Sequence, residues 1–207
     1  MINGNANFIA SLILIPMKKY LPILLLAFLA MSCQITMDHD ENADETKAVE
    51  LYDYDVEQRI SELGLTLPEP SKPVANYVNA VRTGNLVFMA GKGPSKPEGG
   101  YIQGKVGVDL TIEEGYEGAR LAAITQIAAL KAEIGDLNKV VRVVKVLGMV
   151  NCAPDFGNQP EVINGFSDLI VEVFGERGKH ARAAVGMGSL PRNIAVEVEM
   201  IVEVLPQ

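Results

Sequence analysis

The chain has 207 residues, of which 48% are hydrophobic, and it carries 18 basic and 26 acidic residues for a formal net charge of −8. This length predicts one domain with appended segments, and the apolar fraction is sufficient for a packed core. Nucleic acid is disfavoured as a partner, because binding phosphates draws on clustered Lys and Arg side chains and the sequence has no such cluster.

The first 33 residues resemble a bacterial lipoprotein signal peptide. Met17-Lys18-Lys19 supplies positive charge, Leu21 to Leu29 is an apolar run, and Ala30-Met31-Ser32-Cys33 ends at a cysteine. The apolar run is shorter than the roughly 20 residues of a membrane span. We therefore expect residues 1–33 to be a signal, with Met17 as an alternative start and Cys33 as the lipid acceptor. An uncleaved anchor and ordinary secretion are the alternatives. The expected location is exported, in the cell envelope, with a lipid anchor to a membrane.

Removal of residues 1–33 takes away Lys18 and Lys19, which leaves 16 basic and 26 acidic residues and a net charge of −10. Lipidation of Cys33 would leave Cys152 as the sole thiol, so no internal disulfide is expected. Two cysteines and two histidines argue against a structural zinc site, and we expect no metal. Residues 34–54 are polar and acidic and predict a flexible tether, followed by the domain at 55–207.

The first half of the domain predicts a short helix and a pair of strands. Val56 to Leu63 is amphipathic and is followed by Gly64, which favours a helix end. Two strands are expected at 77–82 and 86–90, joined by the turn Thr83-Gly84-Asn85. The glycine-rich loop at 91–100 lacks the GxxxxGK[ST] spacing, so we do not interpret it as a phosphate-binding loop.

The second half predicts two helices and three strands. Thr111 and Glu114 have capping-box spacing, and the helix that they open is expected to end before Gly135. A Val-rich strand is expected at 140–150, a second amphipathic helix at 161–174 and a strand at 182–187. The last segment, 194–204, alternates strictly between two sets of side chains and is the clearest strand of all.

The resulting order, β-β-α-β-α-β-β, predicts an α+β fold with one sheet and both helices on one face. The other face would carry the remaining Val-rich positions. An acidic monomer would not leave such a face in water, so we expect the chain to associate through its sheet.

Three polar residues near the C-terminus invite a functional interpretation. Arg182 lies among small residues and can present a bidentate fork to a carboxylate, although a surface arginine fits the same pattern. Glu197 and Glu199 share a strand face with apolar residues, where a carboxylate can act as a general base; ordinary surface glutamates are the alternative. His180 follows Lys179 at the end of a loop and is expected to be solvated.

The spacing of Arg182, Leu190-Pro191 and Glu197 resembles the C-terminal signature of the RidA (YjgF) family of reactive-intermediate deaminases. Tyr77 is similar to an early family tyrosine, Ala90-Gly91-Lys92 falls where Ser-Gly-Gln is usual, and Asn164 falls near a helical asparagine. The resemblance covers about residues 64–204. It implies a chorismate-mutase-like fold that assembles as a homotrimer, with pockets between subunits.

The resemblance also implies hydrolysis of 2-imino acids to 2-keto acids and ammonia, without a cofactor. Arg182 would hold the carboxylate of a small substrate and Glu197 would orient a water. The predicted substrate-binding positions are Tyr77, Ala90, Gly91, Asn164 and Ala184.

Departures from the family pattern leave other functions open. Ala90 replaces a common serine, Lys92 a common glutamine, and Ala184 a frequent cysteine. A non-enzymatic module that binds small carboxylates is the main alternative to a deaminase. Ribonuclease activity, a label attached to some relatives, is least favoured because of the acidic charge.

Overall fold

The computed structural model describes residues 50–70 and 75–206. The elements in chain order are α2 (Val56–Glu62), β1 (Ala80–Thr83), β2 (Leu86–Lys92), α3 (Ile112–Ile134), η2 (Leu137–Lys139), β3 (Val140–Asn151), α4 (Gln159–Phe174), η3 (Gly175–Gly178), β4 (Ala181–Met187), η4 (Pro191–Asn193) and β5 (Val196–Val204). The predicted order of strands and long helices is confirmed.

The predicted signal at 1–33, the lipid acceptor Cys33 and the tether up to residue 49 lie outside the described residues. Within the two described ranges, every helix is too short or too polar to cross a bilayer.

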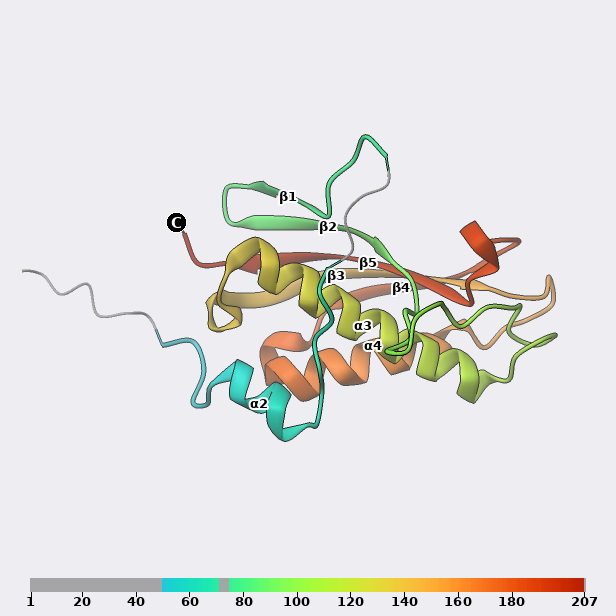
Figure 1. The fold of residues 1–207 in the computed structure, drawn as a ribbon, viewed down its shortest axis with the longest axis horizontal. Helices are drawn as coiled ribbons and strands as arrows, with labels where there is room; N and C mark the ends of the chain where they lie inside the picture. The colour runs from blue at the N-terminus through green and yellow to red at the C-terminus, as the bar shows by residue number, and fades with distance from the viewer. Residues whose placement is uncertain (1–49, 71–74, 207) are drawn as a thin grey trace, which may run out of the picture. The chain divides into compact units, whose positions relative to one another are not determined.

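The strands form one sheet in the order β1-β2-β5-β3-β4. The neighbours β3 and β4 are parallel, because α4 carries the chain back between them, and all other neighbours are antiparallel. Figure 1 shows α3 and α4 together on one face of this sheet. The predicted α+β architecture is therefore confirmed.

The ends of α3 follow the sequence signals closely. The Thr111 hydroxyl accepts a hydrogen bond from the Glu114 backbone N–H at 3.2 Å, and the Glu114 carboxylate accepts one from the Thr111 N–H at 2.8 Å. Gly135 ends the helix with a φ of 79°, which favours glycine. This reciprocal capping fixes where α3 begins over the sheet.

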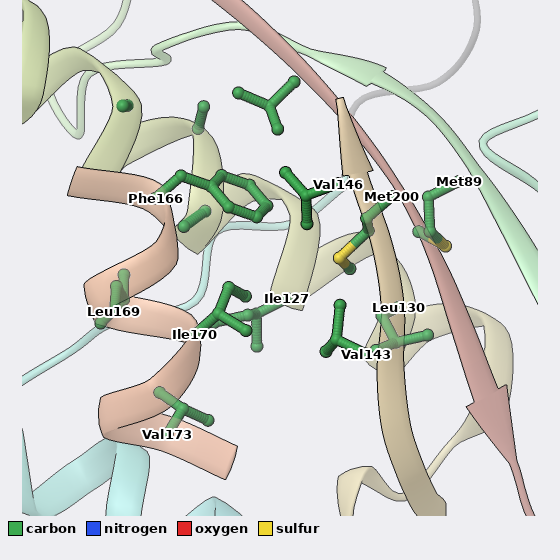
Figure 2. Close-up of a cluster of buried hydrophobic side chains, with 14 of the residues drawn as sticks. Met89, Ile127, Leu130, Val143, Val146, Phe166, Leu169, Ile170, Val173 and Met200 are labelled. Carbon is green, nitrogen blue, oxygen red and sulfur yellow. The ribbon is translucent and has the colours of Figure 1, made fainter. Parts of the chain in front are cut away.

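The core fills the space between the helices and the sheet. α3 packs on β2 and β5, whereas α4 packs on β3 and β4. Figure 2 shows Ile127 of α3 and Phe166 of α4 meeting Val146 and Met200 of the central strands. All four side chains are at most 2% exposed. Burial of this apolar surface drives the packing of the two layers.

Two glycines allow the layers to approach closely. A Cβ atom on Gly148 of β3 would lie 2.6 Å from the side chain of Ile163 in α4. A Cβ atom on Gly165 of α4 would overlap the backbone carbonyl of Tyr116 in α3. The spacing of the helices from the sheet and from each other thus depends on the absence of these side chains.

The predicted limits of three strands were wrong. β1 begins at Ala80 rather than Tyr77, because Tyr77 donates its N–H to Ala75 in a tight turn that leaves the sheet edge. β2 continues to Lys92, beyond the predicted end at residue 90. β5 begins at Val196, because Ala195 pairs with the loop residue Ile102 instead of with β2.

The segment before α2 is fastened to one end of the sheet. The Tyr52 hydroxyl donates to the Val140 carbonyl at 2.7 Å, and the Tyr54 hydroxyl donates to the Val173 carbonyl at 3.0 Å. The Arg177 guanidinium donates to Leu51 and lies over the Tyr52 ring. Residues 50–54, the last of the predicted tether, therefore contact the domain.

The sheet face opposite the helices carries exposed apolar side chains. Val81, Phe88 and Val185 are 56%, 41% and 39% exposed. The register aligns Val81 with Phe88, and Phe88 with Ile201 of β5. This row forms an apolar surface across three strands.

We predict that Gly165→Ala destabilises the fold by about 1–3 kcal/mol, because the added methyl forces α3 and α4 apart. Denaturant titration at fixed protein concentration measures the loss. Gly157→Ala is the matched control, since a Cβ atom there has no neighbour within 4 Å. Equal unfolding midpoints for the two variants would show that the helices are not held by this contact.

Candidate functional site

Glu197 lies on the sheet face opposite the helices, beside an irregularity in β2. Met89 pairs with Met200 and Lys92 pairs with Val198, so β2 has one more residue than β5 in this interval. A Cβ atom on Gly91 would overlap the Glu197 carboxylate. The bulge and its glycine therefore make the space that this carboxylate occupies.

The side chain of Gln126, from α3, holds the bulge in place. Its amide nitrogen donates to the Ala90 carbonyl at 2.9 Å and to the Val198 carbonyl at 2.7 Å. Both acceptors are backbone carbonyls at the irregularity between β2 and β5. Gln126 was not predicted from the sequence, although an amide within the apolar run of a predicted helix is a signal of a buried polar contact.

A cavity of about 340 Å³ opens beside the bulge. It brings together three of the predicted site residues, Tyr77, Gly91 and Glu197. Ala90 lies in the adjacent bulge. The remaining lining comes from β2, α3, the glycine-rich loop and the η4 turn, namely Lys92, Gly93, Ser95, Tyr101, Thr125, Pro191, Arg192 and Ile194.

Two ionisable groups in this cavity are perturbed by burial. Burial raises the pKa of the Glu197 carboxyl above its usual value, and repulsion from Glu199 raises it further. Burial lowers the pKa of the Lys92 ammonium, which is 8% exposed and donates to the Asn79 side-chain oxygen at 2.6 Å. Perturbed groups that share a cavity are a mark of functional sites.

Arg182 lies at the other side of the sheet, against α4. One of its terminal nitrogens, Nη1, donates to the Asn164 side-chain oxygen at 2.9 Å and to the Ser167 hydroxyl at 3.0 Å. The other, Nη2, has a single long contact of 3.5 Å to the Pro160 carbonyl. No carboxylate pairs with this guanidinium among the described residues. The arginine is thus oriented by α4 and still able to bind an anion.

His180 supports this arrangement, and the expectation that it is solvated was wrong. Its Nδ1 lies 2.6 Å from the Gly178 carbonyl, which can only accept, so Nδ1 carries the proton. Nε2 then accepts from the Ser167 hydroxyl at 3.1 Å, whose oxygen accepts from Arg182. Burial lowers the pKa of His180, and this favours the neutral ring that the chain of bonds requires.

Ala184 shares the helix-side face of β4 with Arg182. Arg182 pairs with Val146 and Ala184 pairs with Gly148 in the parallel register. The structure thus gathers Arg182, Asn164 and Ala184 on one side, apart from the cavity that contains Glu197.

Within one chain, Arg182 and Glu197 lie on opposite faces of the sheet. Val146 of β3 pairs with Arg182 of β4 on one side and with the buried Met200 of β5 on the other. Glu197 of β5 pairs with Met149, which lies three residues further along β3. Side chains alternate between faces along a strand, so an odd offset reverses the face. The two predicted catalytic residues therefore belong to separate half-sites of a single copy.

Across the part of the chain that the structure describes, no group of three or more His, Cys, Asp or Glu side chains is placed to bind a metal ion. Cys152 is buried and lies 3.8 Å from the Gln159 amide nitrogen, outside both half-sites.

Comparison with known proteins identifies relatives of this domain. Residues 57–204 match the family model described as "YjgF/chorismate_mutase-like, putative endoribonuclease". Protein TCP17 of Trypanosoma cruzi is 43% identical over 149 residues, which is 72% of this chain and 93% of TCP17. A RutC family protein of Pyrococcus abyssi is 36% identical over 131 residues, 63% of this chain and 87% of that protein.

A solved structure agrees with these matches. The protein Atu1372 from Agrobacterium tumefaciens, whose function is unknown, is 44% identical with a TM-score of 0.68. The match covers 72% of this chain and 92% of Atu1372.

We predict that Glu197→Gln raises the melting temperature at pH 7 by a few degrees, because the fold disfavours the ionised carboxyl. A carboxyl group whose pKa is higher in the folded than in the unfolded chain lowers the stability of the fold once the pH rises above its unfolded-state pKa. Well below that pKa the cost disappears, because the group is protonated in both states. Thermal melts between pH 4 and 8 test this.

Glu69→Gln is the control for this prediction, since it removes one exposed carboxylate outside both half-sites. A difference between Glu197→Gln and wild type that grows toward acid pH would contradict the burial of Glu197.

Proposed function

The chain belongs to the YjgF/RidA family, and on this premise we propose that it hydrolyses 2-imino acids to 2-keto acids and ammonia. The site would be shared between copies of the chain, with Arg182 and Asn164 from one copy and Glu197 and Tyr77 from the next. A closed ring of such contacts between copies would complete every site, and the homotrimer is the ring proposed here.

The observation that carries this proposal is the state of Arg182. Asn164 and Ser167 fix one edge of its guanidinium, while the second edge has no acidic partner among the described residues. A planar fork held in this way suits the carboxylate of a small substrate. Holding that carboxylate would place the imine carbon next to a water and remove much of the entropic barrier.

The separation of the half-sites supports a shared site. Because Glu197 faces away from the helices and Arg182 faces toward them, one copy cannot present both to a small molecule. The exposed side chains of Val81, Phe88 and Val185 supply an apolar surface for a second copy. Association through the open face would cover this surface and bring half-sites of different copies together.

The chemistry needs only proton transfers and one water. The water oxygen forms a bond to the imine carbon as one water proton passes to Glu197, which gives it to the imine nitrogen. The remaining hydroxyl proton then moves to the same nitrogen as the carbon–nitrogen bond breaks, so ammonia leaves, the keto group forms and Glu197 is again a carboxylate. Nothing is oxidised or reduced. A carboxyl whose pKa is raised by burial is suited to this role near neutral pH.

We predict that Arg182→Ala lowers ammonia release from freshly generated 2-iminopropanoate by roughly 100-fold, because the substrate loses its positioning contact. Arg59→Ala, which removes a largely exposed guanidinium from α2, should behave as wild type. Equal rates for wild type and Arg182→Ala would exclude this function. Keto acid binding that depends on Arg182, without turnover, would favour a non-enzymatic carboxylate-binding module.

Mixing two inactive variants tests the shared site. Equal amounts of the Arg182→Ala and Glu197→Gln variants would be unfolded together and refolded. We expect the mixture to recover about a quarter of wild-type activity, because about a quarter of the interfaces would combine an intact Arg182 with an intact Glu197. Light scattering of the same samples measures the assembly. Absence of any recovery in correctly assembled mixtures would place both residues of a working site in one copy.

A further inference from the structure

Lys92 is a buried cation without a counter-charge in the described part of the chain. Lys92 is one of the residues that line the cavity beside Glu197, and it is 8% exposed. Its ammonium donates to the neutral side-chain oxygen of Asn79 at 2.6 Å. None of the ion pairs of the described residues includes Lys92. An ammonium has three donors, and the bond to Asn79 uses one of them.

This arrangement costs stability in the free protein. Removing an ammonium from water is unfavourable unless an opposite charge compensates it. Burial accordingly lowers the pKa of Lys92. Charges kept in a cavity at such a cost are candidates for binding groups.

A second cation stands at the rim of the same cavity. Arg192 is exposed, and its guanidinium has no partner among the described residues. Its backbone is left-handed, with φ of 55°, and so is that of Asn193, with φ of 57°. Left-handed backbone is unfavourable for an arginine, whereas asparagine adopts it more readily, so contacts of the turn must maintain it at Arg192.

Those contacts come from two other elements. The Gln103 amide donates to the Arg192 carbonyl at 2.6 Å, and the Asn193 side chain accepts from Asn151 at 3.0 Å. The turn is thereby held in a form that keeps Arg192 beside the cavity. Lys92 and Arg192 together outnumber the single carboxylate of the lining, Glu197.

From this juxtaposition we infer that the cavity binds a second anionic group, so that the preferred substrates are 2-imino dicarboxylates, the imines of acidic amino acids. The inference rests on the proposed function. Arg182 of one copy would hold the carboxylate next to the imine, and Lys92 and Arg192 of the next copy would hold the distal one. A volume of about 340 Å³ is sufficient for a ligand of this size.

Keto acid products provide the test, because they bind without reacting. Calorimetry would compare 2-oxoglutarate and oxaloacetate with pyruvate and 2-oxobutanoate on the full assembly. We expect wild type to bind the dicarboxylates at least about tenfold more tightly, and Lys92→Gln to reduce this preference by about tenfold. Lys92→Arg should keep the preference. Lys96→Gln changes a lysine of the loop that follows β2, outside this cavity, and is the matched control.

The outcomes separate this inference from the proposed function. Equal affinity for both classes in wild type, or an unchanged preference in folded Lys92→Gln and Lys92→Arg, would overturn the second anion site. Ammonia release without a dicarboxylate preference would leave the deaminase intact and remove only this inference. Tight, Lys92-dependent dicarboxylate binding without ammonia release from any imine would retain the anion site and reject the deaminase.

Discussion

The packing of both long helices on a single face of the sheet is the constraint on which the rest of this structure depends. It places the core between two layers and leaves the apolar side chains of Val81, Phe88 and Val185 exposed on the second sheet face. It also divides the polar residues of interest into two groups. Arg182 contacts α4 on the covered face, whereas Glu197 points to the open one. A domain built in this way presents one of these groups on each face of its sheet.

Within each half-site, side chains of the helices position groups on the strands. Gln126 of α3 reaches across to the bulge of β2, and Asn164 and Ser167 of α4 hold the guanidinium of β4. In both places a helix side chain fixes the position of a group on a strand. Because the helices are in turn held by close glycine contacts, small changes in core packing are transmitted to both half-sites.

Much of the fold could be predicted from residue patterns. The Thr111–Glu114 cap and Gly135 delimit α3, and strict alternation marks most of β5. These features are local, so the sequence alone reveals them. The bulge at Gly91 and the opposite facing of Arg182 and Glu197 depend on the register between strands that are distant in the chain. No local pattern encodes that register. The bond between His180 and Ser167 was missed for the same reason, since it joins a helix to a loop that only the fold brings together.

The tyrosine contacts that precede α2 have a mechanical consequence. They attach the chain at Val140, where β3 begins, whereas Glu197 pairs near the far end of the same strand. Nine residues of strand separate the two points, a distance of about 30 Å. A pulling force applied to the residues before 50 would be taken up by Tyr52, Tyr54 and Arg177, at the end of the sheet remote from the bulge. The contacts of residues 50–54 with the domain are therefore separated from the cavity beside Glu197 by most of the length of β3.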